Sequence, residues 1–496
     1  MKALYSPLAL IISGFLTGLA QQPLELGWLA WFSLLPLLFV FHRIETFKHF
    51  LITGFIWGCA YFLTVIFWLA SNLGTTFTFG VVSLILAVLF CSLNIVLLCF
   101  LTKLVKDKYE NSWFWLFPFI WTSVEYVRNL DILSGGPWTS LANTQLDFLT
   151  LAQNAEITGI YGITFWVVCI NVLIFNYLIR PFPEHYTAGI IVFIFPWITG
   201  LWLTPDYTDN IEDASKLSVS IVQPNIHQKQ KWKPGLASKH LQILIDESRS
   251  AIEDSIELII WPETSTSAYL LQGNDFFLKW IQSELSHSNL IAGITFYSDD
   301  GERKYYNSAA HIEKDTVNSV YHKLRLVPVG EYIPFSHYFP SLSDIDLGQG
   351  NFSSGTEYVI MEVNGVKCAV MICFESTMPY LSREFVNRGA ELLIFLVNDG
   401  WYENPPQPQQ HAKQVVYRAI ENRRPVLRGT NTGISLIVDE RGNISHKIPL
   451  NERGAVQSVI KPVNYSTFYT RHGDIFAQLN VLISIIFILS SIIKRK

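Results

Sequence analysis

Long apolar runs separated by short polar segments fill the first two fifths of the chain. Each run has about the 20 residues that a helix needs to cross a bilayer. Because a second run starts a few residues after the first, the first is interpreted as a retained span and not as a signal peptide. The pattern predicts a multi-span α-helical membrane domain with about eight spans, at residues 4–20, 24–42, 49–71, 78–101, 111–127, 161–179, 186–204 and 474–493.

A different pattern occupies residues 205–473, where short β-branched runs alternate with polar helical stretches. Such alternation is typical of an α/β domain. The expected helices are Ser238–Glu253 and Gln410–Asn422, and Asn404–Pro408 is expected to form a loop. The expected strands are Leu217–Val222, Leu258–Trp261, Leu290–Thr295, Ala369–Cys373 and Leu392–Val397. The chain then divides into a membrane domain at 1–204, a soluble domain at 205–473, and a last span with a tail at 474–496.

The charged residues follow the same division. Of the 36 Lys and Arg plus 41 Asp and Glu, 17 lie in residues 1–204 and 60 lie in the other 292 residues. A membrane region followed by a water-soluble region explains this increase in the density of charged residues. The net charge of −5 is modest and the chain has no Lys/Arg tract, so a nucleic-acid partner is not expected.

The positive charges also indicate an orientation. If the N-terminus is cytoplasmic, ten Lys and Arg residues lie in inside segments, whereas Arg128 alone lies in a short outside loop. Lys and Arg concentrate on the cytoplasmic side of membrane proteins. We therefore expect both termini in the cytoplasm and residues 205–473 outside. In a bacterium this means a multi-pass protein of the inner membrane with its soluble domain on the periplasmic side.

Three apolar runs in residues 205–473 end abruptly in a reactive or charged side chain. Glu263 follows the first, Lys323 the second and Cys373 ends the third. A carboxylate can accept the proton of a thiol, and an ammonium can stabilise both the thiolate and the oxyanion of a tetrahedral intermediate. The three residues therefore form a candidate set for nucleophilic catalysis. Spacing alone leaves the alternatives open: a buried structural thiol, a solvated surface lysine and a carboxylate at a helix start.

The segments around these residues resemble the three signature blocks of the nitrilase superfamily, the carbon–nitrogen hydrolases. Further segments, in both halves of the chain, resemble bacterial apolipoprotein N-acyltransferases. They are Ser134–Trp138, Gly159–Phe165, Val222–Ile226, Trp232, Val397–Trp401 and Gln410-His411. The likeness covers nearly the whole chain, and it implies a nitrilase-like αββα sandwich for residues 205–473.

The resemblance also implies a role for each matching residue. Glu263 would be the general base, Lys323 the cation that stabilises the oxyanion, and Cys373 the nucleophile. Glu331 and Glu375 would be supporting groups that hold Lys323 and the loop geometry.

Four more positions resemble residues near the family's active site. Trp232, Asn307 and Phe374 are candidate substrate-binding residues, and core packing is the alternative for Trp232. Phe374 stands where some members have tyrosine, so no argument can rest on a hydroxyl there. His411 is given no catalytic role, since a polar helix cap explains it equally well.

The reaction that the resemblance implies is a two-step acyl transfer. Cys373 would take an acyl chain from a membrane phospholipid as a thioester, and the α-amine of a diacylglyceryl-modified apolipoprotein cysteine would accept it. No His or Cys cluster has metal-ligand spacing and no Gly-rich phosphate loop occurs, so we expect no metal and no cofactor. The chain is expected to act as a monomer.

Three other functions stay open. A membrane-anchored nitrilase or amidase would use the same residues on a small carbon–nitrogen compound, and a requirement for a phospholipid donor would exclude it. The scarcity of charged residues in the spans argues against a transporter with an accessory outer domain. The presence of all three reactive residues argues against an inactive relative that scaffolds lipoproteins.

An aromatic and proline-rich stretch follows Glu331. Tyr332–Phe335 and Tyr338–Pro340 either pack into the soluble domain or form a lip that admits an acyl chain from the bilayer. Leu270 and Leu271 are expected to line the same entrance.

Overall fold

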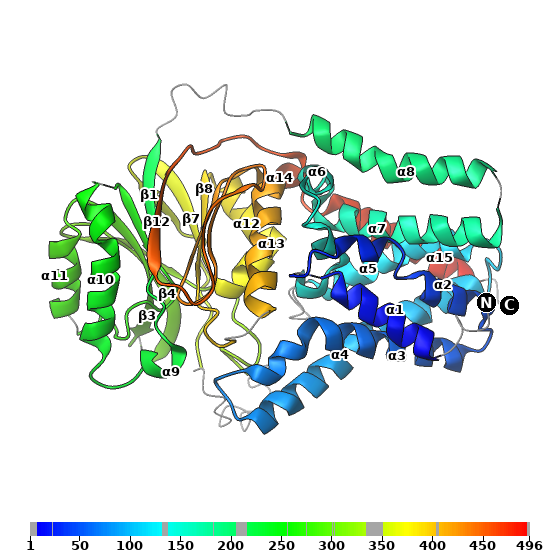
Figure 1. The fold of residues 1–496 in the computed structure, drawn as a ribbon, viewed down its shortest axis with the longest axis horizontal. Coiled ribbons are helices and arrows are strands. Elements are labelled where there is room, and N and C mark those ends of the chain that lie inside the picture. Colours follow the sequence, from blue (N-terminus) through cyan, green and yellow to red (C-terminus); the bar gives the residue numbers. More distant parts are fainter. Residues whose placement is uncertain are drawn as a thin grey trace. The chain divides into compact units, whose positions relative to one another are not determined.

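The structure is a computed structural model of the 496-residue chain. It describes residues 7–21, 23–130, 137–181, 183–204, 216–254, 256–273, 275–299, 301, 303–333, 351–402 and 406–493. The chain divides into two compact units, whose elements are labelled in Figure 1. The helical unit comprises Met1–Ala70, Thr78–Pro205 and Thr467–Lys496, and the sheet unit comprises Ser71–Phe77 and Asp206–Ser466.

The apolar runs form the helices of the helical unit. A proline in the first turn begins both α2 and α5, where the backbone N–H groups have no partner within the helix. α7 is kinked at Gly159, whose φ of 61° is rare for other residues and whose added Cβ would lie 2.7 Å from the Tyr469 ring. The helices are α1 Pro7–Leu19, α2 Leu35–Arg43, α3 Phe47–Ile66, α4 Phe77–Lys106, α5 Phe117–Arg128, α6 Leu149–Ala152, α7 Ala155–Ile179, α8 Pro183–Trp202, α14 Phe468–His472 and α15 Ile475–Ile493.

Among the described residues, four helical stretches are long and apolar enough to cross a membrane, by length and composition. They are Phe47–Ser71, Phe77–Lys106, Ala155–Ile179 and Ile475–Ile493. Shorter apolar helical stretches are Pro7–Leu19, Gly27–Arg43 and, within α8, Thr187–Trp202. α1 has 13 residues and extends for roughly 20 Å at 1.5 Å per residue, which is less than the ~30 Å of a hydrocarbon core.

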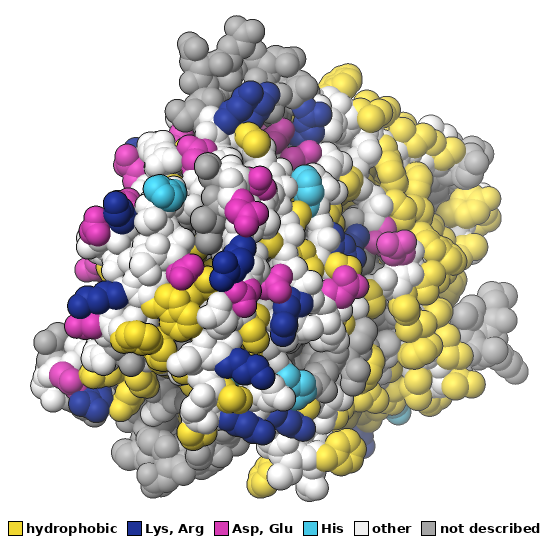
Figure 2. Space-filling model, turned by 60° about the vertical axis from the view of Figure 1, so that its left-hand side comes forward, with side chains coloured by type: hydrophobic (Ala, Val, Ile, Leu, Met, Phe, Trp, Pro, Cys, Tyr) yellow, Lys and Arg dark blue, Asp and Glu magenta, His cyan; other side chains and the backbone are white. Residues whose placement is uncertain are grey.

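Apolar side chains cover much of the outside of the helical unit. Leu86 and Phe90 on α4, Phe195 on α8 and Ile486 on α15 are each more than half exposed. Figure 2 shows hydrophobic side chains gathered over this unit, whereas charged side chains are spread over the sheet unit. An apolar surface of this extent is typical of contact with lipid or with another protein.

Two six-stranded sheets form the centre of the sheet unit. Their strand orders are β12-β1-β2-β3-β4-β5 and β11-β10-β9-β8-β7-β6. α10 and α11 cover the first sheet, and α12 and α13 cover the second (Figure 1). The result is the expected αββα sandwich.

The strands are β1 Leu217–Gln223, β2 Leu258–Trp261, β3 Asn289–Ser298, β4 Lys304–Ile312, β5 Val317–His322, β6 Ile360–Val363, β7 Val366–Ile372, β8 Leu392–Val397, β9 Val426–Thr430, β10 Ser435–Val438, β11 Ile444–Ile448 and β12 Gly454–Ile460. The helices of this unit are α9 Gln228–Lys231, α10 Ala237–Glu253, α11 Asp275–Glu284, α12 Pro379–Asn387 and α13 Gln407–Asn422.

Burial explains why these sequences form these strands. All six residues of β8 are buried, because β8 pairs in parallel with both β7 and β9 and is covered on both faces. Gly429 on β9 allows the two sheets to approach, since a Cβ there would lie 3.1 Å from Ile260 of β2.

Several predicted boundaries differ by a few residues, and two of the differences concern candidate site residues. β7 ends at Ile372, so Cys373 is not the last residue of a strand but the first residue of a 3₁₀ turn, Cys373–Thr377. α13 begins at Gln407 and not at Gln410, because proline is tolerated in the first turn of a helix. Pro408 therefore belongs to α13 and not to a loop, whereas residues 403–405 lie outside the described part of the chain.

Strand ends place the reactive side chains. Glu263 follows β2, Lys323 follows β5, Cys373 follows β7 and Asp399 follows β8. β7 and β8 are parallel neighbours in the second sheet, and β2 and β5 run in the same direction in the first sheet. Each pair of side chains therefore emerges at one edge of its sheet.

Candidate active site

A buried lysine lies between two carboxylates. Lys323 is 1% exposed, and its Nζ lies 2.8 Å from Glu331 Oε2 and 3.5 Å from Glu263 Oε1. Burial by itself would lower the pKa of Lys323, but Glu331 and Glu263 raise it above its ordinary value. Lys323 is therefore a fixed cation at this site.

Asn307 on β4 joins the same two carboxylates. Its Nδ2 donates to Glu263 Oε1 at 2.7 Å and to Glu331 Oε1 at 2.9 Å. Its main-chain carbonyl accepts the N–H of Lys323 at 2.9 Å. Asn307 is 2% exposed, so the amide that the sequence suggested for substrate binding is engaged in holding the carboxylates.

Cys373 has an unusual backbone conformation. Its φ of 54° is uncommon for a residue with a side chain, and such conformations cluster at functional sites. The residue is partly exposed. Burial raises the pKa of the Cys373 thiol well above its usual value, Glu263 raises it further and Lys323 lowers it. The thiol is thus protonated near pH 7, and Glu263 is the carboxylate that raises its pKa most strongly.

A buried polar network holds the backbone of Cys373. His411 Nε2 lies 3.2 Å from the Cys373 carbonyl oxygen and 2.9 Å from Ser376 Oγ. His411 Nδ1 lies 2.8 Å from Asp399 Oδ1, and Arg428 Nη2 donates to Asp399 Oδ2 at 2.7 Å. The interpretation of His411 as a helix cap is wrong, because α13 starts four residues earlier and the imidazole is fully engaged in this network.

Contacts within this network shift the pKa values of its members. Burial would raise the pKa of Asp399, but His411 and Arg428 hold it below its ordinary value. Burial and Arg428 lower the pKa of His411 in spite of Asp399. Asp399 is therefore ionised near pH 7, between the His411 imidazole and the Arg428 guanidinium.

Sequence reasoning did not single out Asp399 or Arg428. Asp399 directly follows the fully apolar β8, which is the same signal that selected Glu263 and Cys373. Arg428 lies within β9, and only the fold reveals that a charge is buried there.

Glu375 joins the turn at Cys373 to the segment that follows β5. It is fully buried, and its oxygens accept hydrogen bonds at 2.6–3.0 Å from the N–H groups of Ile372, Leu324 and Arg325 and from the Tyr321 hydroxyl. Burial raises the pKa of Glu375 to about 7, against its hydrogen bonds and the charge of Lys323. The Glu375 carboxyl group thus fixes both the turn that carries Cys373 and the segment that follows Lys323.

A second buried lysine was also missed. Lys231 ends α9 and is 1% exposed, and its Nζ donates to the main-chain carbonyl of Glu263 at 3.1 Å. Burial lowers the pKa of Lys231 to about 8, whereas Glu263 and Cys373 raise it. Its neighbours Lys229 and Gln230 are exposed, so nothing in the local sequence sets this lysine apart.

The two aromatic candidates lie at more open positions. Trp232 is 49% exposed, so core packing does not explain it. Phe374, next to Cys373, is partly exposed.

Most of the predicted lip, residues 334–340, lies outside the described part of the chain. Leu270 does not line an entrance, because it is 1% exposed and belongs to the core between the first sheet and its helices. Leu271 packs against the same core.

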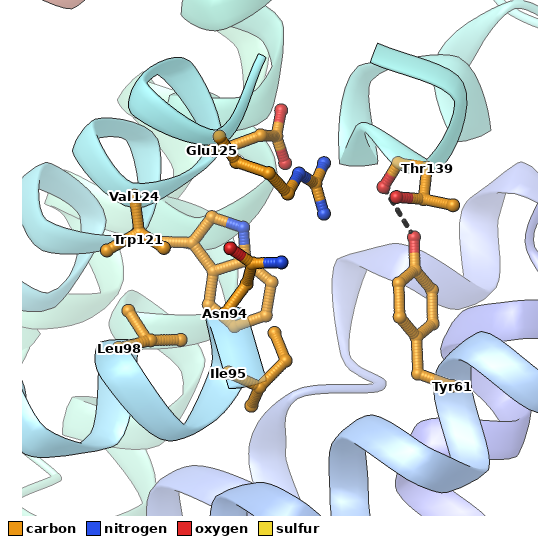
Figure 3. Close-up of a pocket in the computed structure, with 9 residues that line it drawn as sticks. Tyr61, Asn94, Ile95, Leu98, Trp121, Val124, Glu125 and Thr139 are labelled. Carbon is orange, nitrogen blue, oxygen red and sulfur yellow. Dashed lines mark hydrogen bonds between the residues drawn. The ribbon is translucent and has the colours of Figure 1, made fainter. Parts of the chain in front are cut away.

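A polar pocket in the helical unit is a separate feature (Figure 3). Its space, open mouth included, is about 330 Å³, and Tyr61 points across it to donate to the Thr139 carbonyl at 2.8 Å. Glu125 in its wall accepts hydrogen bonds from Thr164 and from the N–H of Leu141. None of the predicted site residues lines this pocket.

The αββα layers and the thiol, carboxylate and lysine at the strand ends define the class of the sheet unit. Residues 218–468 match the carbon-nitrogen hydrolase family. Residues 13–173 match the N-terminal domain of apolipoprotein N-acyltransferases.

Comparison with known proteins extends this match over the whole chain. The apolipoprotein N-acyltransferase of Geobacter metallireducens is 31% identical over 487 residues, covering 94% of this chain and 91% of that protein. The apolipoprotein N-acyltransferase of Thermotoga maritima is 29% identical over 500 residues, covering 98% and 93%. A solved carbon-nitrogen hydrolase from Helicobacter pylori G27 is 19% identical with a TM-score of 0.39, covering 50% of this chain and 89% of that one. The chain belongs to the apolipoprotein N-acyltransferase family.

Proposed function

We propose that the chain is an integral membrane enzyme that transfers an acyl chain from a membrane phospholipid to the α-amino group of the N-terminal diacylglyceryl-cysteine of apolipoproteins. One observation carries the chemistry: Glu263 and Lys323 both act on the Cys373 thiol. The same chain has helices that are apolar enough to cross a membrane, which suits a donor that lives in the bilayer.

In the first half-reaction, Glu263 accepts the proton of the Cys373 thiol as the sulfur attacks the ester carbonyl of the phospholipid. The tetrahedral intermediate carries an oxyanion, which the ammonium of Lys323 stabilises. One preorganised oxyanion donor is typically worth ~10²–10³-fold in rate. The bond from the carbonyl carbon to the glycerol oxygen then breaks, Glu263 returns its proton to that oxygen, and a lysophospholipid leaves.

In the second half-reaction, the α-amine of the apolipoprotein cysteine attacks the thioester carbonyl. Glu263 accepts a proton from the attacking nitrogen, and Lys323 again stabilises the oxyanion. The carbon–sulfur bond breaks, an amide forms, and the proton held by Glu263 returns to the sulfur. The kinetics are therefore of the two-step, ping-pong type.

The remaining buried residues position these three. Glu331 and Asn307 hold Lys323 and Glu263 at fixed distances, and Glu375 holds the turn that carries Cys373. Phe374 and Trp232, which are both partly exposed beside the cluster, are proposed to contact substrate.

The proposed setting is the bacterial inner membrane. The chain crosses it about eight times, with the shorter apolar helices completing spans together with their neighbouring segments. The excess of Lys and Arg in the expected inside segments supports cytoplasmic termini and a periplasmic sheet unit. The enzyme acts as a monomer.

A two-substrate assay tests the proposal. Full-length protein in phospholipid nanodiscs receives a synthetic peptide with an N-terminal diacylglyceryl-cysteine, and its N-acylated product is followed by mass spectrometry. We expect double-reciprocal plots for the two substrates to be parallel, and no product without phospholipid. Release of ammonia from a simple amide in detergent without phospholipid, together with no peptide acylation, would contradict the proposal and favour an amidase.

A further inference from the structure

The charged side chains that act most strongly on the Cys373 thiol are mostly negative. Glu263, Asp399 and Glu331 raise the pKa of this thiol, whereas Lys323 lowers it. Arg428 and Tyr402 also interact with the thiol, and His411 Nε2 lies 3.2 Å from the Cys373 carbonyl oxygen. Ionisation of the thiol adds a further negative charge to this cluster.

Lys231 brings a further positive charge to this cluster. Its ammonium is almost inaccessible to solvent and it interacts with both Glu263 and Cys373. On the side of α10, its titratable neighbour is His240, on which Lys239 also acts. Burial lowers the pKa of His240, and Lys231 lowers it further, so the imidazole is neutral near pH 7 and does not change the balance.

The hydrogen bond that Lys231 donates does not by itself require a charged donor. Its Nζ donates to the main-chain carbonyl of Glu263, which a neutral amide donor could satisfy equally well. A buried ammonium is costly unless opposite charges compensate it. The negative charges of the cluster therefore explain a buried ammonium at this position better than this single hydrogen bond does.

We propose that Lys231 is a positioning residue of the catalytic cluster, which fixes the main chain of Glu263 and supplies the positive charge that allows the Cys373 thiol to lose its proton. This inference rests on the proposed function in that Cys373 is its nucleophile. It adds to Lys323 and Arg428 a further cation, which holds Glu263 through its main-chain carbonyl and not through its carboxylate.

The test is the reactivity of Cys373 toward iodoacetamide, which requires no phospholipid and no apolipoprotein. The rate is measured on the full-length protein by peptide mass spectrometry between about pH 5.5 and 9.5, a range that covers ordinary thiol titration. Lys231→Gln keeps a donor for the Glu263 carbonyl without the charge, whereas Lys231→Arg keeps a charge. Lys229→Met, which removes an exposed lysine from the same short helix, is the matched control.

In Lys231→Gln, we expect the pH of half-maximal alkylation to rise by about one unit and the rate at pH 7 to fall about tenfold, because a buried cation beside the thiolate has been lost. Lys231→Arg and Lys229→Met should keep the midpoint of the wild-type protein. A purely structural role would instead lower the rate of Lys231→Gln, or leave it unchanged, without moving the midpoint, and either result would overturn the proposal.

The outcome is separable from that of the proposed function. A wild-type protein that fails to acylate the peptide but shows the expected shift in Lys231→Gln would refute the acyl-transfer function and leave the role of Lys231 intact. If Lys231→Gln does not fold, Lys231→Arg alone decides: loss of Cys373 reactivity in a folded Lys231→Arg protein would contradict a role based on charge.

Discussion

Removal of Arg428 should destabilise the sheet unit much more than removal of a surface arginine. The side chains of Arg428 and Asp399 are 0% and 1% exposed, and their charged atoms lie 2.7 Å apart. Arg428→Met leaves the Asp399 carboxylate buried without its cation, and breaking a buried pair in this way typically costs ~3–5 kcal/mol. At roughly 2–4 °C per kcal/mol for a domain of this size, the unfolding temperature should fall by about 6–20 °C.

A matched control comes from the surface of α12. Arg388 pairs with Glu384 at 2.8 Å, and their side chains are 42% and 32% exposed. Exposed pairs contribute ~0.2–1 kcal/mol, so Arg388→Met should lower the unfolding temperature by less than about 4 °C. Tryptophan fluorescence of the full-length protein during heating in detergent measures both variants.

A double variant and the pH dependence sharpen the test. Arg428→Met combined with Asp399→Leu should recover most of the lost stability, because no buried charge is left unpaired. The lowered pKa of Asp399 means that its contribution is complete above its unfolded pKa of ~3.9 and is lost as the pH falls through the lower folded value. The gap between wild type and Arg428→Met should therefore be full at pH 7. A shift as small as that of Arg388→Met, or a double variant no more stable than the single one, would refute the reasoning.

Four further outcomes are expected. Lys323→Arg should lose nearly as much acylation rate as Lys323→Ala, about 10²-fold or more, because a planar guanidinium does not replace a compact ammonium between two carboxylates; near-normal turnover would mean that only long-range charge matters. Glu263→Gln should abolish the pre-steady-state burst of thioester, and a normal burst would exclude it as the base. Asn307→Asp should be less active than Asn307→Ala in peptide acylation, since it adds a third carboxylate where an amide donor joins two; the reverse order would count against that bridge. Cysteines introduced at Lys48 and Lys216 should react with a membrane-impermeant thiol reagent from opposite sides of the membrane, and labelling of both from one side would contradict the proposed orientation.

The alternation of strands and helices in the sheet unit could be predicted because local pattern and burial agree there, whereas the αββα layering was implied by the family resemblance. β2 and β8 have the predicted bounds, since a short apolar run between polar segments becomes a covered strand. Cys373 is outside its predicted strand because a residue at positive φ cannot continue a β ladder, and no sequence pattern reveals that angle.

Burial in the folded protein explains why some residues of the site could not be predicted from the sequence. Lys231 and Arg428 look like ordinary charged residues in the sequence, and they matter only because the fold removes them from water. The Ser71–Phe77 segment is a similar case. It connects two apolar helices, yet it belongs to the sheet unit, where the Leu73 N–H donates to the Trp401 carbonyl across more than 300 residues of sequence.

The central claim is that Cys373 carries an acyl chain as a thioester, and intact-mass analysis tests it most directly. Full-length protein is incubated with phospholipid in the absence of an acceptor peptide. The account predicts a gain of one acyl group that is absent in Cys373→Ala, is kept in Cys368→Ala, and disappears on addition of the peptide. An acyl adduct that persists in Cys373→Ala, or no adduct in a wild-type protein that still acylates the peptide, would contradict it.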